Sequence, residues 1–215
     1  YNTTLYVATD DMPHIVSSLT AYLSAHFGGF LAIFHPIFLA ERNTDGKLIS
    51  LRGTGTRANL ASGDTAAVGM PSLQLSEGAP EGSTVTIESW IAIRLTRYLN
   101  EDDLRLLEHD VRRVLADVRA CYTDLEGMVT AVFDISQAMY ELRGATLGHG
   151  EESYAANPRG VEPASRVEVA QDFLRWLTRG NFVFMGVKER VLDGTSGAIA
   201  LVDRPGSALG ILRST

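Results

Sequence analysis

The chain has 215 residues, of which 45% are hydrophobic, and this is enough to bury a core in one large or two small domains. Its 19 Lys and Arg against 26 Asp and Glu give a net charge of −7, which opposes the binding of nucleic acid or of an anionic membrane surface. Its single cysteine, Cys121, excludes an internal disulfide and an all-cysteine metal site, and favours a reducing cytoplasm.

The start of the chain has neither the basic nor the apolar region of a secretory signal. The longest apolar run, residues 30–40, is interrupted by His35-Pro36 and is too short to span a bilayer. We therefore expect a soluble protein with no membrane partner. Because the chain begins without methionine and stops just after a strand-like stretch, we also expect it to be a piece of a longer polypeptide.

The first elements predict a strand, a tight turn and a helix. Residues 4–9 are rich in strand-forming residues, and Asp10-Asp11-Met12-Pro13 follows at once. An Asp cap with Pro in the first turn is typical of a helix start. Apolar residues then recur at helical spacing up to Phe27, and Gly28-Gly29 predicts the helix end.

A hairpin and a loop are predicted next. Residues 30–42 predict one long buried strand, in which Pro36 marks a bulge or an edge position because it cannot donate to a ladder. The turn residues 44–47 then predict a hairpin with residues 48–52. Residues 53–82 are rich in small residues and have little periodicity, which predicts a long loop.

Alternation predicts a strand with one buried face over residues 84–95. Its polar face carries Glu88, Trp90 and Arg94. Trp90 packs under a helix or forms a contact between subunits or domains, and we take these three residues as a candidate interface. Two amphipathic helices follow within residues 100–142, and their apolar stripes suit core packing or oligomer contacts.

A linker separates these elements from a second α/β module. Residues 144–164 hold several Gly and Pro and form the best internal boundary. Residues 169–177 then predict a helix closed by Gly180, and residues 181–192 predict a strand whose hairpin partner is residues 198–202.

Several strings resemble, in order, the N-terminal region of the large bacterial NAD-specific glutamate dehydrogenases. In the first half they are Asp10-Asp11-Met12-Pro13, His35-Pro36 with Asp45-Gly46, and Glu88-Ser89-Trp90. In the second half they are Phe173-Leu174-x-Trp176-Leu177, Asn181-Phe182-x-Phe184-x-Gly186 and Leu209-Gly210-Ile211-Leu212. The resemblance covers nearly the whole chain.

The resemblance implies an α+β, ACT-like (ferredoxin-like) antiparallel sheet packed with helices. We therefore expect an ACT-like domain over residues 1–100, a helical segment over 101–145, a linker over 146–164, and the start of a second ACT-like α/β module over 165–215. Two features depart from the usual ACT pattern. His14 stands where a small Gly is usual, and a long loop stands where a helix usually precedes the last strand.

The resemblance further implies a regulatory and assembly segment of a large enzyme that converts L-glutamate and NAD to 2-oxoglutarate and ammonia. The segment itself is expected to hold no cofactor and no catalytic residue, with NAD bound elsewhere in the parent enzyme. Its expected partners are the catalytic domain of the same chain, an allosteric amino-acid effector and further copies in an oligomer. The alternative is a purely structural scaffold for oligomer or interdomain contacts, with no small-molecule ligand.

The effector would bind at the turn between the first strand and the first helix. Its ammonium group would face Asp10 and Asp11. Its carboxylate would face the backbone N–H groups of the segment Met12-Pro13-His14, in which Pro13 has no N–H. The competing interpretation is that the two carboxylates only cap the helix and favour its dipole.

Two other sites are weaker. Gly53-x-Gly55-x-x-Ala58 matches part of a dinucleotide fingerprint, but residues 59–78 lack the helix that must follow it, so we favour a loop over an independent NAD site. The five His residues have no metal-ligand spacing, and none lies beside Cys121, which we expect to be a buried inert thiol.

Overall fold

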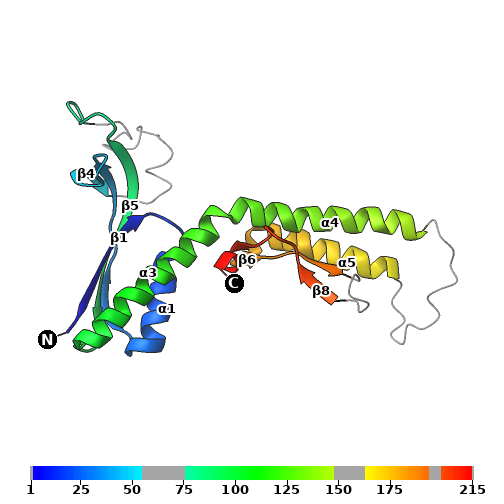
Figure 1. Ribbon diagram of the computed structural model, residues 1–215, viewed down its shortest axis with the longest axis horizontal. Helices are drawn as coiled ribbons and strands as arrows, with labels where there is room; N and C mark the ends of the chain where they lie inside the picture. Colours follow the sequence, from blue (N-terminus) through cyan, green and yellow to red (C-terminus); the bar gives the residue numbers. More distant parts are fainter. Residues whose placement is uncertain (1, 55–75, 148–162, 194–199, 215) are drawn as a thin grey trace. The chain divides into compact units, whose positions relative to one another are not determined.

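The computed structural model describes residues 2–54, 76–147, 163–193 and 200–214. The chain divides into two compact units, Tyr1–Val118 and Arg119–Thr215. Unit 1 contains a β-sheet with two helices, and unit 2 contains two helices with short strands (Figure 1). Among the described residues, no helix is long and apolar enough to cross a membrane.

Unit 1 is built on one antiparallel sheet. Its strands are β1 (Thr4–Asp10), β2 (Phe30–Phe34), β3 (Ile37–Arg42), β4 (Leu48–Thr54) and β5 (Thr84–Leu95). Strand β5 is central: β1 pairs with one edge, and β3 and β2 pair in succession with the other, so that Ile37 lies opposite Ser89 and Ile33 opposite Ile93. Strand β4 pairs with β3 at the far side. The sheet and its helices confirm the predicted α+β, ACT-like fold class.

The long strand predicted over residues 30–42 is two strands. His35-Pro36 separates β2 from β3, where Pro36 has no N–H to offer. Its carbonyl oxygen still accepts a hydrogen bond from the N–H of Trp90 at 3.0 Å, so both strands stay on the same edge of β5. Pro36 was predicted to mark a bulge or an edge position within one strand, and it instead lies in the break between two strands.

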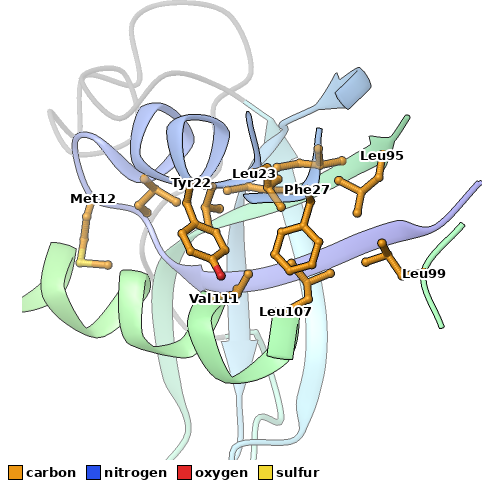
Figure 2. Packing of buried hydrophobic residues seen from close by; sticks show 12 residues of the cluster. Met12, Tyr22, Leu23, Phe27, Leu95, Leu99, Leu107 and Val111 are labelled. Carbon is orange, nitrogen blue, oxygen red and sulfur yellow. The ribbon is translucent and has the colours of Figure 1, made fainter. Parts of the chain in front are cut away.

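Helices α1 (Ile15–Phe27) and α3 (Glu101–Thr123) bury one face of the sheet (Figure 1). Figure 2 shows Tyr22, Leu23 and Phe27 of α1 meeting Leu107 and Val111 of α3 in one cluster. The cluster also contains three side chains from alternate positions of β5: Ile91, Ile93 and Leu95. Burial of each large apolar side chain stabilises the unit by about 1.5–3 kcal/mol. Within the described residues, the second helix on this face is therefore α3, which follows β5, the last strand of the sheet.

The helix boundaries agree partly with the sequence pattern. Asn100 caps α3, because its Oδ1 accepts a hydrogen bond from the N–H of Asp103 at 2.9 Å. Asp124 ends α3, and α4 (Leu125–Leu147) begins directly after it, as the pattern indicates. Helix α4 reaches into the first residues of the predicted linker, and residues 148–162 of that linker lie outside the described part of the chain.

Unit 2 places α5 (Pro163–Trp176) beside α4 (Figure 1). A π-helical turn, Leu177–Asn181, follows α5, and Gly180 within it leaves the helical conformation with φ 81°. Strand β6 (Gly186–Val187) pairs with β9 (Leu209–Gly210), and β7 (Arg190–Asp193) pairs with β8 (Ala200–Asp203).

The predicted hairpin of unit 2 is confirmed, with Val191 opposite Val202. The continuous strand predicted over residues 181–192 is wrong. Residues 182–185 are not in a strand, although Phe182 and Phe184 favour one, because no described strand pairs with them.

Candidate functional site

The turn between β1 and α1, residues 10–14, is the predicted effector site. The N–H of Asp11 donates to the carbonyl oxygen of Ile87 at 2.9 Å, which ties the turn to β5. Asp11 and Met12 are buried, with 8% and 6% exposure, whereas Asp10 and His14 are exposed. The side chain of Met12 belongs to the hydrophobic core.

The predicted aspartate cap of the first helix is wrong. Helix α1 begins at Ile15, its N-cap is His14, and no acidic residue lies in its first turn. His14 makes no side-chain cap hydrogen bond and has a left-handed backbone with φ 69°. The αL conformation is one that Gly adopts freely and that costs other residues free energy.

Asp11 instead belongs to a chain of hydrogen-bonded side chains that joins three segments of the protein. The buried hydroxyl of Ser89 in β5 donates to Oδ1 of Asp11 at 2.6 Å. Nε2 of His35, between β2 and β3, lies 2.9 Å from the same Oγ. Because Ser89 has one proton and gives it to Asp11, Nε2 of His35 is the donor in the second bond.

The Asp11–Ser89–His35 chain has the residue types of a hydrolase triad but not its order. In a triad the histidine stands between the nucleophile and the carboxylate, so that it can take the proton of the hydroxyl. Here the hydroxyl of Ser89 stands in the middle, is fully buried and is directed at a carboxylate. The arrangement positions the turn and does not activate Ser89.

Glu88 organises the outer face of the sheet, which is the face away from α1 and α3. Arg42 donates to both of its carboxylate oxygens, at 2.6 Å from Nε and 2.8 Å from Nη2. Nε1 of Trp90 and Oγ1 of Thr86 also donate to it, at 2.9 Å and 3.3 Å. The hydrogen bonds from Arg42 hold the pKa of Glu88 below its usual value.

The structure thus brings together two of the three predicted interface residues, Glu88 and Trp90. Arg94 lies on the same face but farther along β5, opposite Thr4 of β1 and Ala32 of β2, and is exposed. Arg42 was not among the predicted site residues, because the pairing of its strand with β5 is not apparent from the sequence.

The outer face also exposes aromatic side chains. Ala92 of β5 lies opposite both Tyr6 of β1 and Phe34 of β2, and these two rings are 78% and 68% exposed. Trp90 packs edge-on against Phe38 of β3, with ring centroids 5.6 Å apart. An exposed apolar patch with a polar neighbour is typical of an interaction surface. We call it the outer aromatic face, formed by Tyr6, Phe34, Phe38 and Trp90.

The described part of unit 2 contains a buried ionic site that was not predicted from the sequence. Asp124, between α3 and α4, accepts two hydrogen bonds from the guanidinium of Arg213 and one from the N–H of Gly210 at 2.8 Å. The Arg213 guanidinium holds the pKa of the Asp124 carboxyl below its usual value. Gly210 has φ 62°, and a Cβ there would collide with the carbonyl oxygen of Met185.

The remaining predicted sites are placed as follows. Cys121 is partly exposed, so the expected buried thiol is wrong, and its Sγ donates to the carbonyl oxygen of Met185 at 3.1 Å. Gly53 lies in β4, while Gly55 and Ala58 of the dinucleotide motif lie outside the described residues. Within the described ranges, no three His, Cys, Asp or Glu side chains are arranged to hold a metal ion.

Comparison with known proteins identifies the family of the first half of the chain. Residues 1–111 match the family described as the glutamate dehydrogenase ACT1 domain. The chain belongs to this family. The NAD-specific glutamate dehydrogenase of Halomonas elongata is 28% identical to it over 212 residues, which are 99% of this chain and 11% of the relative. The chain therefore spans about a tenth of that relative's length, and the resemblance seen in the sequence to an N-terminal, ACT-like region is confirmed.

Proposed function

We propose that this chain is a regulatory and assembly segment of a large NAD-dependent glutamate dehydrogenase. The observation that carries this proposal is the ACT1 family match over residues 1–111, which is supported by a relative that is far longer than this chain. In this proposal another part of the polypeptide binds NAD and converts L-glutamate to 2-oxoglutarate and ammonia in the cytoplasm. The segment passes the effect of effector binding or of subunit assembly on to that catalytic part.

The outer aromatic face supports the assembly role. Tyr6 and Phe34 expose most of their rings, although burial of each would stabilise a contact by about 1.5–3 kcal/mol. The bidentate Arg42–Glu88 pair fixes Trp90 through its Nε1, so the face is ordered before a partner binds. An ordered face of aromatic side chains suits a homo-oligomer or a contact with the catalytic domain.

The test of assembly uses the full-length enzyme. We expect Phe34→Asp to weaken subunit association at least roughly tenfold in sedimentation, since it places a charge in the contact. The matched control is Glu108→Ala, in an exposed ion pair on α3. An unchanged oligomer for Phe34→Asp, together with unchanged glutamate-dependent NADH formation, contradicts the assembly role.

Effector binding at residues 10–14 is the second function, and the family match favours it. Because Asp11 is buried against Ser89 and Met12 lies in the core, Asp10, Pro13 and His14 are the side chains that reach solvent. Calorimetric titration of the full-length enzyme with a panel of amino acids tests this function. Saturable binding that is lost in Asp10→Ala supports an effector site, while silence across the panel supports the structural scaffold. NAD reduction by residues 1–215 alone contradicts the assignment of catalysis to another part of the enzyme.

A further inference from the structure

Unit 2 encloses little apolar surface compared with what it exposes. In its described part the buried hydrophobic cluster consists of Met128, Val132 and Phe184, and the partly buried side chains packed against it are Val129, Leu174, Leu177, Val187 and Leu209. Its large side chains with 38% exposure or more are Tyr122, Leu125, Phe133, Ile135, Val169, Phe173, Trp176, Phe182, Val183, Met185, Leu201 and Val202. Single exposed apolar residues are ordinary, but this excess over the buried cluster is typical of a domain that lacks part of its cover.

The strands of unit 2 point to the same conclusion. The β6–β9 pair has two residues in each strand, and the β7–β8 pair has four. Isolated two-stranded pairs are marginal in water, and their outer edges present unpaired N–H and C=O groups. Among the described residues no third strand joins either pair. Both pairs therefore have edges on which a further strand could add.

Five of the exposed side chains lie on the last turns of α5 and in the residues that follow it in the chain. Phe173 and Trp176 are stacked one helical turn apart, with ring centroids separated by 6.1 Å, and are 57% and 48% exposed. Phe182, Val183 and Met185 follow in the chain and are all more than half exposed. We call these five residues the 173–185 surface. Covering it would remove several large apolar side chains from water at once.

We propose that the 173–185 surface is a docking site for the part of the same polypeptide that follows residue 215 in the full-length enzyme, and that this part adds a strand to an edge of the β6–β9 or β7–β8 pair. This inference rests on the proposal that the chain is a segment of a longer glutamate dehydrogenase. It does not depend on an effector or on oligomer formation.

Two observations favour this occupant over a second copy. The relative has about nine-tenths of its length outside the matched segment, so ample chain is available to supply the cover. The ion pair of Arg213 with Asp124, and the hydrogen bond from Gly210 to Asp124, hold residues 209–214 within unit 2. The N–H of Ile211 also donates to the carbonyl oxygen of Met185 at 2.9 Å. Residues that follow therefore start close to the Met185 end of the surface at a high effective concentration, whereas a second copy must bind from solution.

The test compares thiol labelling in the full-length enzyme and in residues 1–215, both with Cys121→Ser, which keeps a donor for Met185. We expect Phe173→Cys and Val183→Cys to react roughly tenfold or more slowly in the full-length enzyme, read out peptide by peptide. Asp172→Cys is the matched control, because this neighbour of Phe173 on α5 has a side chain that is 79% exposed. It should react at similar rates in both proteins.

Equal labelling of Phe173→Cys and Val183→Cys in both proteins overturns the proposal. Protection that already appears in residues 1–215 and grows with protein concentration also overturns it, because the occupant is then a second copy. Hydrogen exchange on the unsubstituted proteins guards against a substitution that disturbs folding. The amides of at least one of the strands β6, β7, β8 and β9 should exchange more slowly in the full-length enzyme, and identical exchange in all four counts against the added strand.

Discussion

Asp124 and Arg213 lie 89 positions apart in the chain, and the guanidinium of Arg213 donates to both oxygens of the Asp124 carboxylate. The side chain of Asp124 is 5% exposed and that of Arg213 is 55% exposed, so the carboxylate is the buried partner. Because Asp124 stands at the junction of α3 and α4, this pair fixes the last described turn of the chain to the start of a long helix.

Loss of this carboxylate should destabilise unit 2. Asp124→Ala leaves the N–H of Gly210 and the guanidinium of Arg213 without their acceptor, and we expect a cost of about 2 kcal/mol. Urea unfolding followed by hydrogen exchange in β6 and β9 measures it. Arg204→Ala removes an exposed pair with Glu189 and should cost less than about 1 kcal/mol. Equal losses of unfolding free energy for the two variants would show that the Asp124–Arg213 pair stabilises unit 2 no more than an exposed ion pair does.

Glu88 should make the stability of unit 1 depend on acidic pH. Its pKa is lowered in the folded state by the hydrogen bonds from Arg42, so its stabilising contribution is present above the unfolded-state value of 4.5. The contribution is lost as the pH falls through the lower, folded-state pKa. We expect Glu88→Gln to be less stable than the parent at pH 7, with the difference shrinking steadily below about pH 4.5.

Urea midpoints of both proteins across pH 2–7, followed by the fluorescence of Trp90 and Trp176, test this dependence. The control is Glu101→Gln, whose side chain is 89% exposed beside Arg105 and should leave the profile parallel to the parent's. A stability difference between Glu88→Gln and its parent that stays constant over the whole range would argue against an ionised Glu88 in the fold.

Local patterns in the sequence predicted much of unit 1. The alternation over residues 84–95 was sufficient to place Ile91 and Ile93 in the core, because a strand with one buried face has a strict period of two. Ser89 falls on the same face as Ile91, where a buried polar residue needs a hydrogen-bond partner, but the alternation does not identify that partner. The partner, Asp11, is 78 positions away, and only the pairing of β1 with β5 brings it there.

Unit 2 shows the limit of the same reasoning. The hairpin of β7 and β8 follows from nearby residues and was predicted, whereas the pairing of β6 with β9 joins residues more than twenty positions apart. Asp124 directly precedes α4, and nothing local in the sequence indicated that Arg213 would bind it. Long-range ion pairs have no period in the sequence, so the patterns of helices and strands do not reveal them.

Tyr22 should titrate far above an ordinary tyrosine. Burial, together with the hydrogen bond from its hydroxyl to Asp110, raises the pKa of Tyr22 from 10.0 to about 12. The neutral phenol is favoured in the fold, so its contribution to stability is complete below pH 10.0 and is lost as the pH rises through about 12. Absorbance at alkaline pH, recorded directly after a pH jump and compared with Tyr22→Phe, should show a step near pH 12 that the variant lacks. If the difference between the parent and Tyr22→Phe instead shows a step near pH 10.0, the phenol is not held by Asp110 in the core.

His14 offers a test of the turn that leads into α1. Its φ of 69° lies in the left-handed region, where a Cβ costs about 1–2 kcal/mol and a β-branched side chain is especially unfavourable. Its carbonyl oxygen accepts hydrogen bonds from the N–H of Ser18 and the hydroxyl of Ser17, both at 3.0 Å, and any residue at position 14 keeps these. The backbone angle, rather than the imidazole, therefore decides what position 14 tolerates.

We expect His14→Val to lose about 1–2 kcal/mol, and His14→Gly to be as stable as the parent or up to about 1 kcal/mol more stable. The gain for glycine is limited because glycine also raises the conformational entropy of the unfolded chain. Hydrogen exchange of the amides in the first turns of α1 measures both variants. A His14→Val protein that is as stable as His14→Gly would contradict the left-handed turn. If the turn also binds an effector, His14→Gly should keep or strengthen that binding, since it opens the backbone at the position where the usual ACT pattern has glycine.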